Sequence, residues 1–182
     1  MISKKFTALA SLLLCQTAWA TDNLPSTISH NTADFQLCED FTLRYGVVIK
    51  VAEIGWYAPD CSASVSLLEA NQKILRFHYH KNVSGDFFRE SAEEYFLINL
   101  ENKEQQRDLT QPLQQFNQGY TDIKSGEYFD LVHWQDKELN LFKNNQLLAS
   151  TTNPILANKY FNIWFGKSPV INKLKKAFIE SP

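Results

Sequence analysis

Three polar side chains alternate along a short apolar segment of the chain, namely Asp40, Thr42 and Arg44. In a β-strand, residues two apart point to the same face, so these three would share one face of a sheet. A guanidinium group inside an apolar cleft favours a carboxylate head group, because it donates two parallel hydrogen bonds to it. Arg44 is therefore a candidate anchor for a ligand anion, with Thr42 beside it. The alternative is that Arg44 pairs with Asp40 or faces solvent.

Two histidines, His78 and His80, have the same two-residue spacing. On a strand their imidazoles would lie on one face, and imidazole pairs can bind zinc or copper. Two ligands are too few, and a third would have to come from elsewhere, for example His133 or Asp130. We therefore favour histidines that bind no metal. The sequence also has no glycine-rich phosphate loop, Ser-His-Asp spacing or paired CxxC motif, and nothing in it requires a cofactor.

The first 20 residues have the features of a signal peptide. Lys4 and Lys5 supply a basic start, residues 8–15 supply a short apolar run, and Ala20 is a small residue at the predicted cleavage position. The apolar run is shorter than the roughly 20 residues that a membrane-spanning helix needs, so no membrane span is expected after cleavage. The sequence therefore predicts an exported protein whose mature chain begins after Ala20.

Three cysteines occur in the chain, and the predicted cleavage removes Cys15. An exported chain that keeps two cysteines, here Cys38 and Cys61, is expected to join them in a disulfide. A disulfide requires an oxidising compartment, and the simplest assignment is a bacterial periplasm.

The composition is that of a folded protein of one domain. The 182 residues are 44% hydrophobic, 13% aromatic and 21% charged, with a formal net charge of −2, and this balance is typical of globular chains. Nucleic acids and anionic membrane surfaces require a dense basic footprint, so neither is expected as a partner. We assign residues 21–32 to a flexible leader and residues 33–182 to one domain.

Strand signals dominate two parts of the chain. Residues 41–45 and 47–56 are rich in β-branched and aromatic side chains on either side of Gly46, which predicts a hairpin. Residues 73–80 alternate between an apolar face, with Phe77 and Tyr79, and a mixed face. Further strands are predicted at residues 127–134, 139–143 and 146–150, with turns at 135–138 and 144–145.

Helical periodicity fills the segment between these groups of strands. Ser84 is the expected N-cap of a helix that runs to about Leu100. A second helix is predicted within residues 101–118, where Pro112 suits a helix start.

After the last strand the sequence predicts two more helices. The first begins at Asn153-Pro154 and ends at Gly166, and Ser168-Pro169 repeats the same start before the last helix. Strands and helices thus come in separate runs without regular βαβ alternation. This order predicts an α+β domain in which helices cover one face of an antiparallel sheet.

Several segments resemble the chalcone isomerase-like family, and in particular its exported bacterial branch. They are the hairpin segments 42–46 and 50–59, the Val-Ser-Gly start of the helix at 83–85, the segment 143–148, and Phe-Asn-Ile-Trp-Phe-Gly at 161–166. The resemblance implies an open-faced β-sandwich, a curved antiparallel sheet covered by a layer of helices with a ligand cleft between them. That fold occurs in plant enzymes that close a flavanone ring and in non-catalytic relatives that bind fatty acids.

The positions that match the family's catalytic residues depart from the enzyme pattern. The resemblance places Asp40 where the enzymes carry a catalytic arginine, Ala52 where they carry a water-holding threonine, and Phe88 where they carry a tyrosine. Loss of such an oxyanion donor typically lowers a rate about 100-fold or more, so chalcone cyclisation is not expected and no catalytic residue is assigned.

We therefore expect a non-catalytic protein that binds a small apolar or carboxylate ligand, such as a fatty acid, in the cleft. The candidate ligand-binding residues are Arg44, Thr42, Ala52 and Phe88. One alternative is an isomerase or lyase in which Arg44 stabilises an anion. A second alternative is a periplasmic accessory protein that has no ligand and binds a protein partner.

Overall fold

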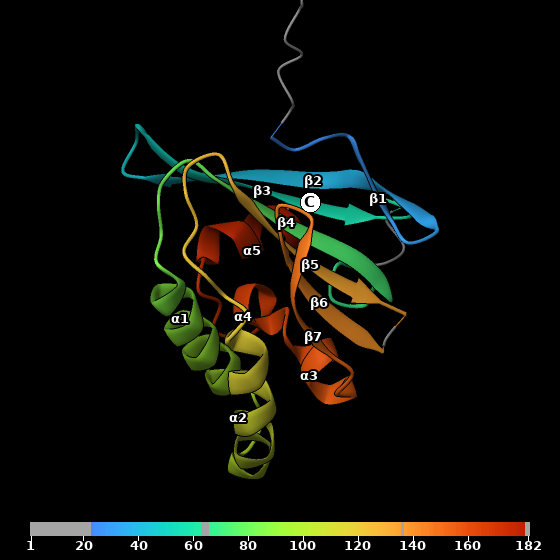
Figure 1. Ribbon diagram of the computed structural model, residues 1–182, viewed down its shortest axis with the longest axis vertical. Helices are drawn as coiled ribbons and strands as arrows, with labels where there is room; N and C mark the ends of the chain where they lie inside the picture. The colour runs from blue at the N-terminus through green and yellow to red at the C-terminus, as the bar shows by residue number, and fades with distance from the viewer. Residues whose placement is uncertain (1–22, 63–65, 136, 181–182) are drawn as a thin grey trace, which may run out of the picture.

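In the part of the chain that the structure describes, seven strands form one antiparallel sheet, in which each strand pairs with its neighbours in chain order (Figure 1). The computed structural model describes residues 23–62, 66–135 and 137–180. The predicted signal peptide and its cleavage site at Ala20 lie outside these residues. The strands are β1 (Thr27–His30), β2 (Ala33–Tyr45), β3 (Ile49–Ala58), β4 (Gln72–Tyr79), β5 (Tyr128–Trp134), β6 (Glu138–Lys143) and β7 (Gln146–Thr151).

The predicted hairpin turns at Gly46 and at residues 144–145 are confirmed, whereas the turn predicted at 135–138 includes residue 136, which lies outside the described residues. Gly46 connects β2 to β3 with a φ of 64°, a left-handed conformation that glycine adopts without steric cost. Asn144 and Asn145 connect β6 to β7 with φ values of 48° and 67°, and asparagine tolerates this region better than most residues. These turns place consecutive strands side by side.

Alternation along the strands divides the sheet into two faces. On β4, Leu75 and Phe77 belong to the main core beneath the helices. Ile74 belongs to a smaller apolar cluster on the opposite, outer face, together with Phe35 and Tyr57. The predicted assignment of alternate β4 residues to two faces is therefore correct.

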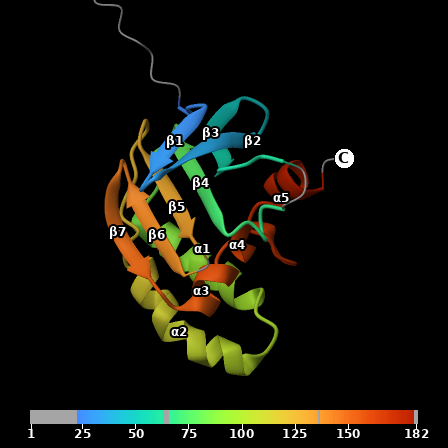
Figure 2. The same cartoon turned by 90° about the vertical axis from the view of Figure 1, so that its right-hand side faces the viewer.

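The helices cover the concave face of the curled sheet (Figure 2). Helix α1 (Gly85–Ile98) begins at Ser84, whose side chain accepts a hydrogen bond from the Phe87 N–H, as a predicted N-cap should. The other helices are α2 (Lys103–Asn117), α3 (Pro154–Lys159), α4 (Asn162–Phe165) and α5 (Asn172–Ile179). Within the described ranges, no helix combines the length and the apolar run needed to cross a membrane. The predicted α+β class, with helices on one face of an antiparallel sheet, is confirmed.

Two predicted helix starts are wrong. Helix α2 begins after Asn102, whose side chain accepts a hydrogen bond from the Gln105 N–H, so Pro112 lies inside the helix. The last helix begins after Ile171 and not after Ser168, because the side chain of Asn99 holds the backbone of Ser168 on both sides.

The single helix predicted between Pro154 and Gly166 is two short helices. The N-cap at Asn153 is confirmed, since its side chain accepts hydrogen bonds from two backbone N–H groups. Around Tyr160 and Phe161 the backbone changes to i→i−3 hydrogen bonds, which tighten the chain and divide α3 from α4.

The segment predicted to be loose contains a strand. Within residues 21–32, Thr27–His30 forms β1 and pairs with β2 along its full length. The expectation of a flexible leader missed this pairing of β1 with β2, because backbone hydrogen bonds need no apolar pattern in the sequence.

The predicted disulfide between Cys38 and Cys61 is present. It ties β2 to the segment that follows β3. Nearby, the register of β2 shifts between Leu37 and Glu39. As a result Leu37 packs in the outer cluster, whereas Phe41 and Leu43 pack in the main core although all three are odd-numbered.

Candidate functional site

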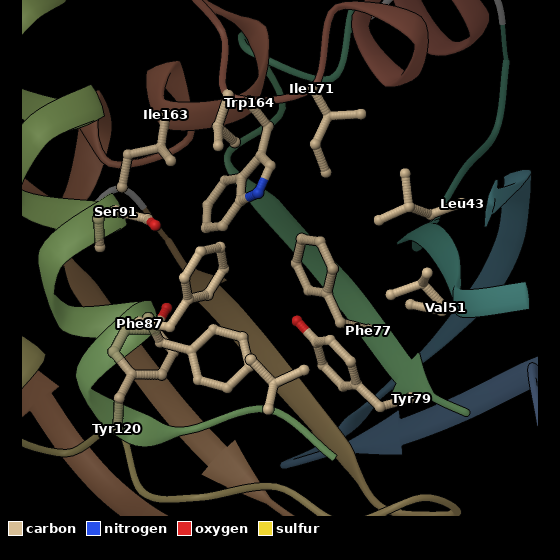
Figure 3. A pocket seen from close by; sticks show the side chains of 15 residues that line it. Leu43, Val51, Phe77, Tyr79, Phe87, Ser91, Tyr120, Ile163, Trp164 and Ile171 are labelled. Atoms are coloured by element: carbon tan, nitrogen blue, oxygen red, sulfur yellow. The ribbon is translucent and has the colours of Figure 1, made fainter. Parts of the chain in front are cut away.

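A cavity of about 300 Å³ lies between the concave face of the sheet and the helices (Figure 3). Its volume is roughly twice that of the ~150 Å³ apolar cavity that holds one benzene molecule, and it lies at the lower end of the range for ligand pockets. The cavity therefore has room for a ligand of moderate size.

The sheet supplies one side of the cavity. Leu43 on β2 and Ala52 on β3 are register partners, and both line it. Phe77 and Tyr79 on β4 follow, because residues two apart share a face. Figure 3 shows the hydroxyl of Tyr79 directed into the space between sheet and helices.

Helix α1 supplies the opposite side. Phe87 and Ser91 are four residues apart, as are Phe88 and Ala92, so both pairs lie on the same part of the helix surface. The small side chains of Ser91 and Ala92 leave space that larger residues would fill. Phe87 is 57% exposed, which places an aromatic ring at the mouth of the cavity.

The end of the cavity is formed by α4 and by the loop that precedes α5. Ile163 and Trp164 come from α4, and Val170 and Ile171 from the loop. The rings of Trp164 and Phe77 have centroids 5.1 Å apart. Helix and sheet are therefore in direct contact at this end.

An aromatic cluster fixes the shape of the cavity. Phe88 contacts Tyr79 edge-on at 5.4 Å and stacks on Tyr120 at 5.6 Å, and all three surround Phe129. Aromatic pairs in such geometries contribute roughly 0.5–1.5 kcal/mol each beyond their burial. The cluster is thus expected to keep its shape when no ligand is present.

The polar atoms of the cavity are uncharged at neutral pH. Burial raises the pKa of Tyr79 and of Tyr120 well above the ordinary value, so both phenols keep their protons. Tyr160 donates its hydroxyl hydrogen to the side-chain oxygen of Asn117 at 2.6 Å, and its oxygen lies 3.3 Å from the hydroxyl oxygen of Tyr120. Among the described residues, no Asp, Glu, Lys, Arg or His lines the cavity. This lining can enclose apolar groups and donate or accept neutral hydrogen bonds.

Two of the four predicted ligand-binding residues line the cavity and two do not. Ala52 and Phe88 line the cavity. Thr42 is the register partner of Glu53 on the outer face, and Arg44 is exposed beyond it. Leu43, between these two residues, lines the cavity, whereas Thr42 and Arg44 do not.

Asp40, which the sequence resemblance aligns with the catalytic arginine of the enzymes, is exposed and does not line the cavity.

Sequence reasoning missed most of the lining. Tyr79 was recognisable, because alternation placed it on the apolar face of its strand with Phe77. Ser91 and Ala92 are small residues one turn after Phe87 and Phe88, and they were a weaker indication of open space beside the helix. Val170 lies in a loop and carried no signal, whereas Ile171 has helical spacing with Leu174 and Phe178, which indicated core packing but not a cavity.

A second group of side chains lies on the outer face of the sheet, where Glu53, His78 and His80 place their potential ligand atoms within 4.8 Å of one another. The third ligand suggested for the histidines was His133 or Asp130. Asp130 instead forms a buried, bidentate pair with Arg76, at 2.7 and 2.6 Å. The third potential ligand is instead Glu53, because it is the register partner of His78.

The comparisons with known proteins agree with this architecture. A family model described as chalcone isomerase-like matches residues 16–179. Among solved structures, the fold is similar to that of a fatty-acid binding protein from Arabidopsis thaliana, with a TM-score of 0.64 and 17% identity over 85% of this chain and 90% of that chain. No curated protein matches the chain. The family match spans nearly the whole sequence, and the chain therefore belongs to the chalcone isomerase-like family.

Proposed function

We propose that this protein binds a single apolar ligand, such as a fatty acid of medium length, in the cavity between sheet and α1 without converting it chemically. The observation that carries this proposal is the lining, which is apolar apart from a few neutral polar groups. Acid–base chemistry requires groups whose pKa values lie near the working pH, and the phenols of this cavity titrate far above it.

The similar Arabidopsis structure is a fatty-acid binding protein, which supports the ligand class. At 17% identity the likeness concerns the fold, so the ligand assignment here depends on the lining itself. Because the described lining residues include no cation, we expect the cavity to recognise the hydrocarbon part of its ligand. Tyr79 and Ser91 contribute neutral hydrogen bonds.

The proposed location is outside the cytoplasm, most simply a bacterial periplasm, as expected for the exported bacterial branch of the family. The Cys38–Cys61 disulfide supports an oxidising compartment. Mass spectrometry of the secreted chain tests this directly, since export with cleavage after Ala20 yields a mature N-terminus at Thr21. A chain that retains residues 1–20 in the cytoplasm with free thiols would contradict it.

The test of binding is a titration of the protein with dodecanoic acid and with dodecanol. Trp164 lines the cavity, so its fluorescence reports occupancy. Because no cation among the described lining residues fixes a carboxylate, we expect the two ligands to bind with affinities within about tenfold of each other. A preference for the acid well above 100-fold, about 2.7 kcal/mol, would require a charged anchor that the described part of the lining lacks.

A matched pair of variants tests whether the ligand binds in the cavity. Ala52→Leu places a larger side chain in the cavity, and we expect it to weaken binding of dodecanoic acid at least tenfold. Ala33→Leu makes the same change on the outer-face side of β2, beside the smaller apolar cluster, and should leave affinity unchanged. Equal affinity in both variants would contradict the assignment. An empty protein that binds neither probe would favour the accessory-protein alternative.

A further inference from the structure

Glu53, His78 and His80 form a cluster on the face of the sheet opposite the ligand cavity. Glu53 and His78 are register partners on β3 and β4, and His80 follows His78 by two residues. Side chains at such directly opposed and diagonal positions are within reach of one another. The backbone of the sheet therefore holds three potential ligands at one place.

The distances suit one small cation. The three ligand atoms lie within 4.8 Å of one another, whereas a tetrahedral zinc ion with bonds of 2.0–2.2 Å places its ligands about 3.4 Å apart. The Nε2 atom of His80 is already 2.7 Å from the Oε2 atom of Glu53. One pair of ligand atoms is therefore already closer than a bound ion requires, and the whole group lies within 4.8 Å.

The buried histidine of the cluster has an unused nitrogen. His78 is 7% exposed, and its Nδ1 atom has no hydrogen-bond partner among the described residues. A buried polar atom without a partner is costly, and metal coordination removes that cost.

The protonation states also suit a metal. Burial and the neighbouring His80 lower the pKa of His78, which keeps its imidazole neutral. Burial raises the pKa of Glu53, but hydrogen bonds from Lys50, Asn23 and His80 outweigh it and lower the value to about 2. At neutral pH the cluster offers a carboxylate and a neutral imidazole, as metal coordination requires.

Lys50 is the main competitor. Its ammonium group lies 2.5 Å from the Oε1 atom of Glu53, whereas Oε2 faces His80 and also accepts a hydrogen bond from Asn23 at 2.8 Å. The carboxylate can therefore bind a cation through Oε2 while it keeps Lys50 on Oε1. The positive charge nearby lowers the affinity for a cation without blocking the site.

We propose that Glu53, His78 and His80 bind one divalent transition-metal ion of the zinc type, with a fourth position open to water. Two imidazoles and one carboxylate are a known donor set for zinc. The site is independent of the proposed ligand cavity, because its three side chains lie on the opposite face of the sheet.

The test is a zinc titration of the mature, disulfide-bonded protein without an affinity tag, by calorimetry and by thermal unfolding. We expect one ion per chain and a rise in Tm with zinc concentration. His80→Ala and Glu53→Gln should each weaken binding at least tenfold. His30→Ala is the matched control, since His30 lies on β1 against Trp134 and Phe142, and it should bind zinc as the wild type does.

A second variant tests the role of Lys50. Lys50→Met should strengthen zinc binding several-fold, because it removes a competing cation. With cobalt as the probe, the visible spectrum should show tetrahedral coordination that His78→Gln abolishes. The proposal is overturned if zinc does not bind below millimolar concentration, or if His30→Ala weakens binding as much as His80→Ala. It is also overturned if Lys50→Met lowers the affinity for zinc.

Discussion

The two faces of the same sheet have opposite chemistry. The concave face, under the helices, has an apolar cavity with neutral hydroxyls, whereas the outer face has a buried ion pair between Arg76 and Asp130 and the cluster around Glu53. Neighbouring residues in the chain belong to different faces: Ala52 lines the cavity and Glu53 belongs to the outer cluster. A strand thus supplies two sites at once, and a shift of one residue in register would exchange them.

The largest expected effect concerns the outer face. Arg76 and Asp130 are 6% and 5% exposed, so Asp130→Ala leaves a buried guanidinium without its partner. Such losses cost about 3–5 kcal/mol of the free energy of unfolding. Urea denaturation measures this loss in the free energy of unfolding. The double variant Arg76→Leu/Asp130→Leu is the control and should recover most of the loss; an equally unstable double variant would contradict the explanation by unpaired charge.

Removal of the disulfide should have the next largest effect. Cys38 and Cys61 are 23 residues apart, and opening a loop of this length costs about 3 kcal/mol. The bond involves no residue of the cavity lining, so Cys38→Ala/Cys61→Ala should lower the free energy of unfolding and leave the affinity for dodecanoic acid unchanged. A large loss of affinity in the folded variant would mean that the two faces are coupled.

On the concave face, Phe88→Ala should lower stability by about 2 kcal/mol, less than for a fully buried phenylalanine, because Phe88 is only partly buried. The substitution also enlarges the cavity. We expect the preferred chain length of saturated fatty acids to increase, as measured by the titration of Trp164 fluorescence. An unchanged preference would show that the rings of Tyr79 and Tyr120 collapse into the space.

The smallest effect is a pH dependence of the outer face. Hydrogen bonds lower the pKa of Glu53 from 4.5 to about 2. The ionised carboxylate therefore stabilises the folded state fully above pH 4.5, and this contribution is lost as the pH falls towards 2. At pH 7, Glu53→Gln should be less stable than the wild type by about 1 kcal/mol. That difference should vanish by about pH 2, as measured by urea denaturation across this range.

Glu94→Gln, on the exposed surface of α1, is the control for the pH series. It should show no such convergence with the wild type. A difference between wild type and Glu53→Gln that stays constant with pH would contradict the role of the carboxylate charge.

Much of the fold was predictable from local pattern. Two-residue alternation placed Phe77 and Tyr79 on the apolar face of β4, and Gly46 and Asn144 indicated their turns. These signals depend on the backbone and on neighbouring residues only. The errors arose where a distant contact decided the outcome, as at Ser168, which the side chain of Asn99 holds 69 residues away.

The site was only partly predictable for the same reason. The family resemblance identified Ala52 and Phe88, which line the cavity, but alternation cannot say which face of a strand meets the helices. Arg44 and Thr42 were therefore predicted to face the cleft, but neither lines the cavity. Glu53 was not recognised as a neighbour of His78, because the register between β3 and β4 is a tertiary property.

The most direct test is native mass spectrometry of the mature protein purified from its own compartment without detergent. We expect each chain to contain one apolar molecule, identified after organic extraction, and Ala52→Leu to be recovered empty. A wild-type protein that is empty, and that remains empty after equilibration with excess dodecanoic acid, would contradict ligand binding in the cavity.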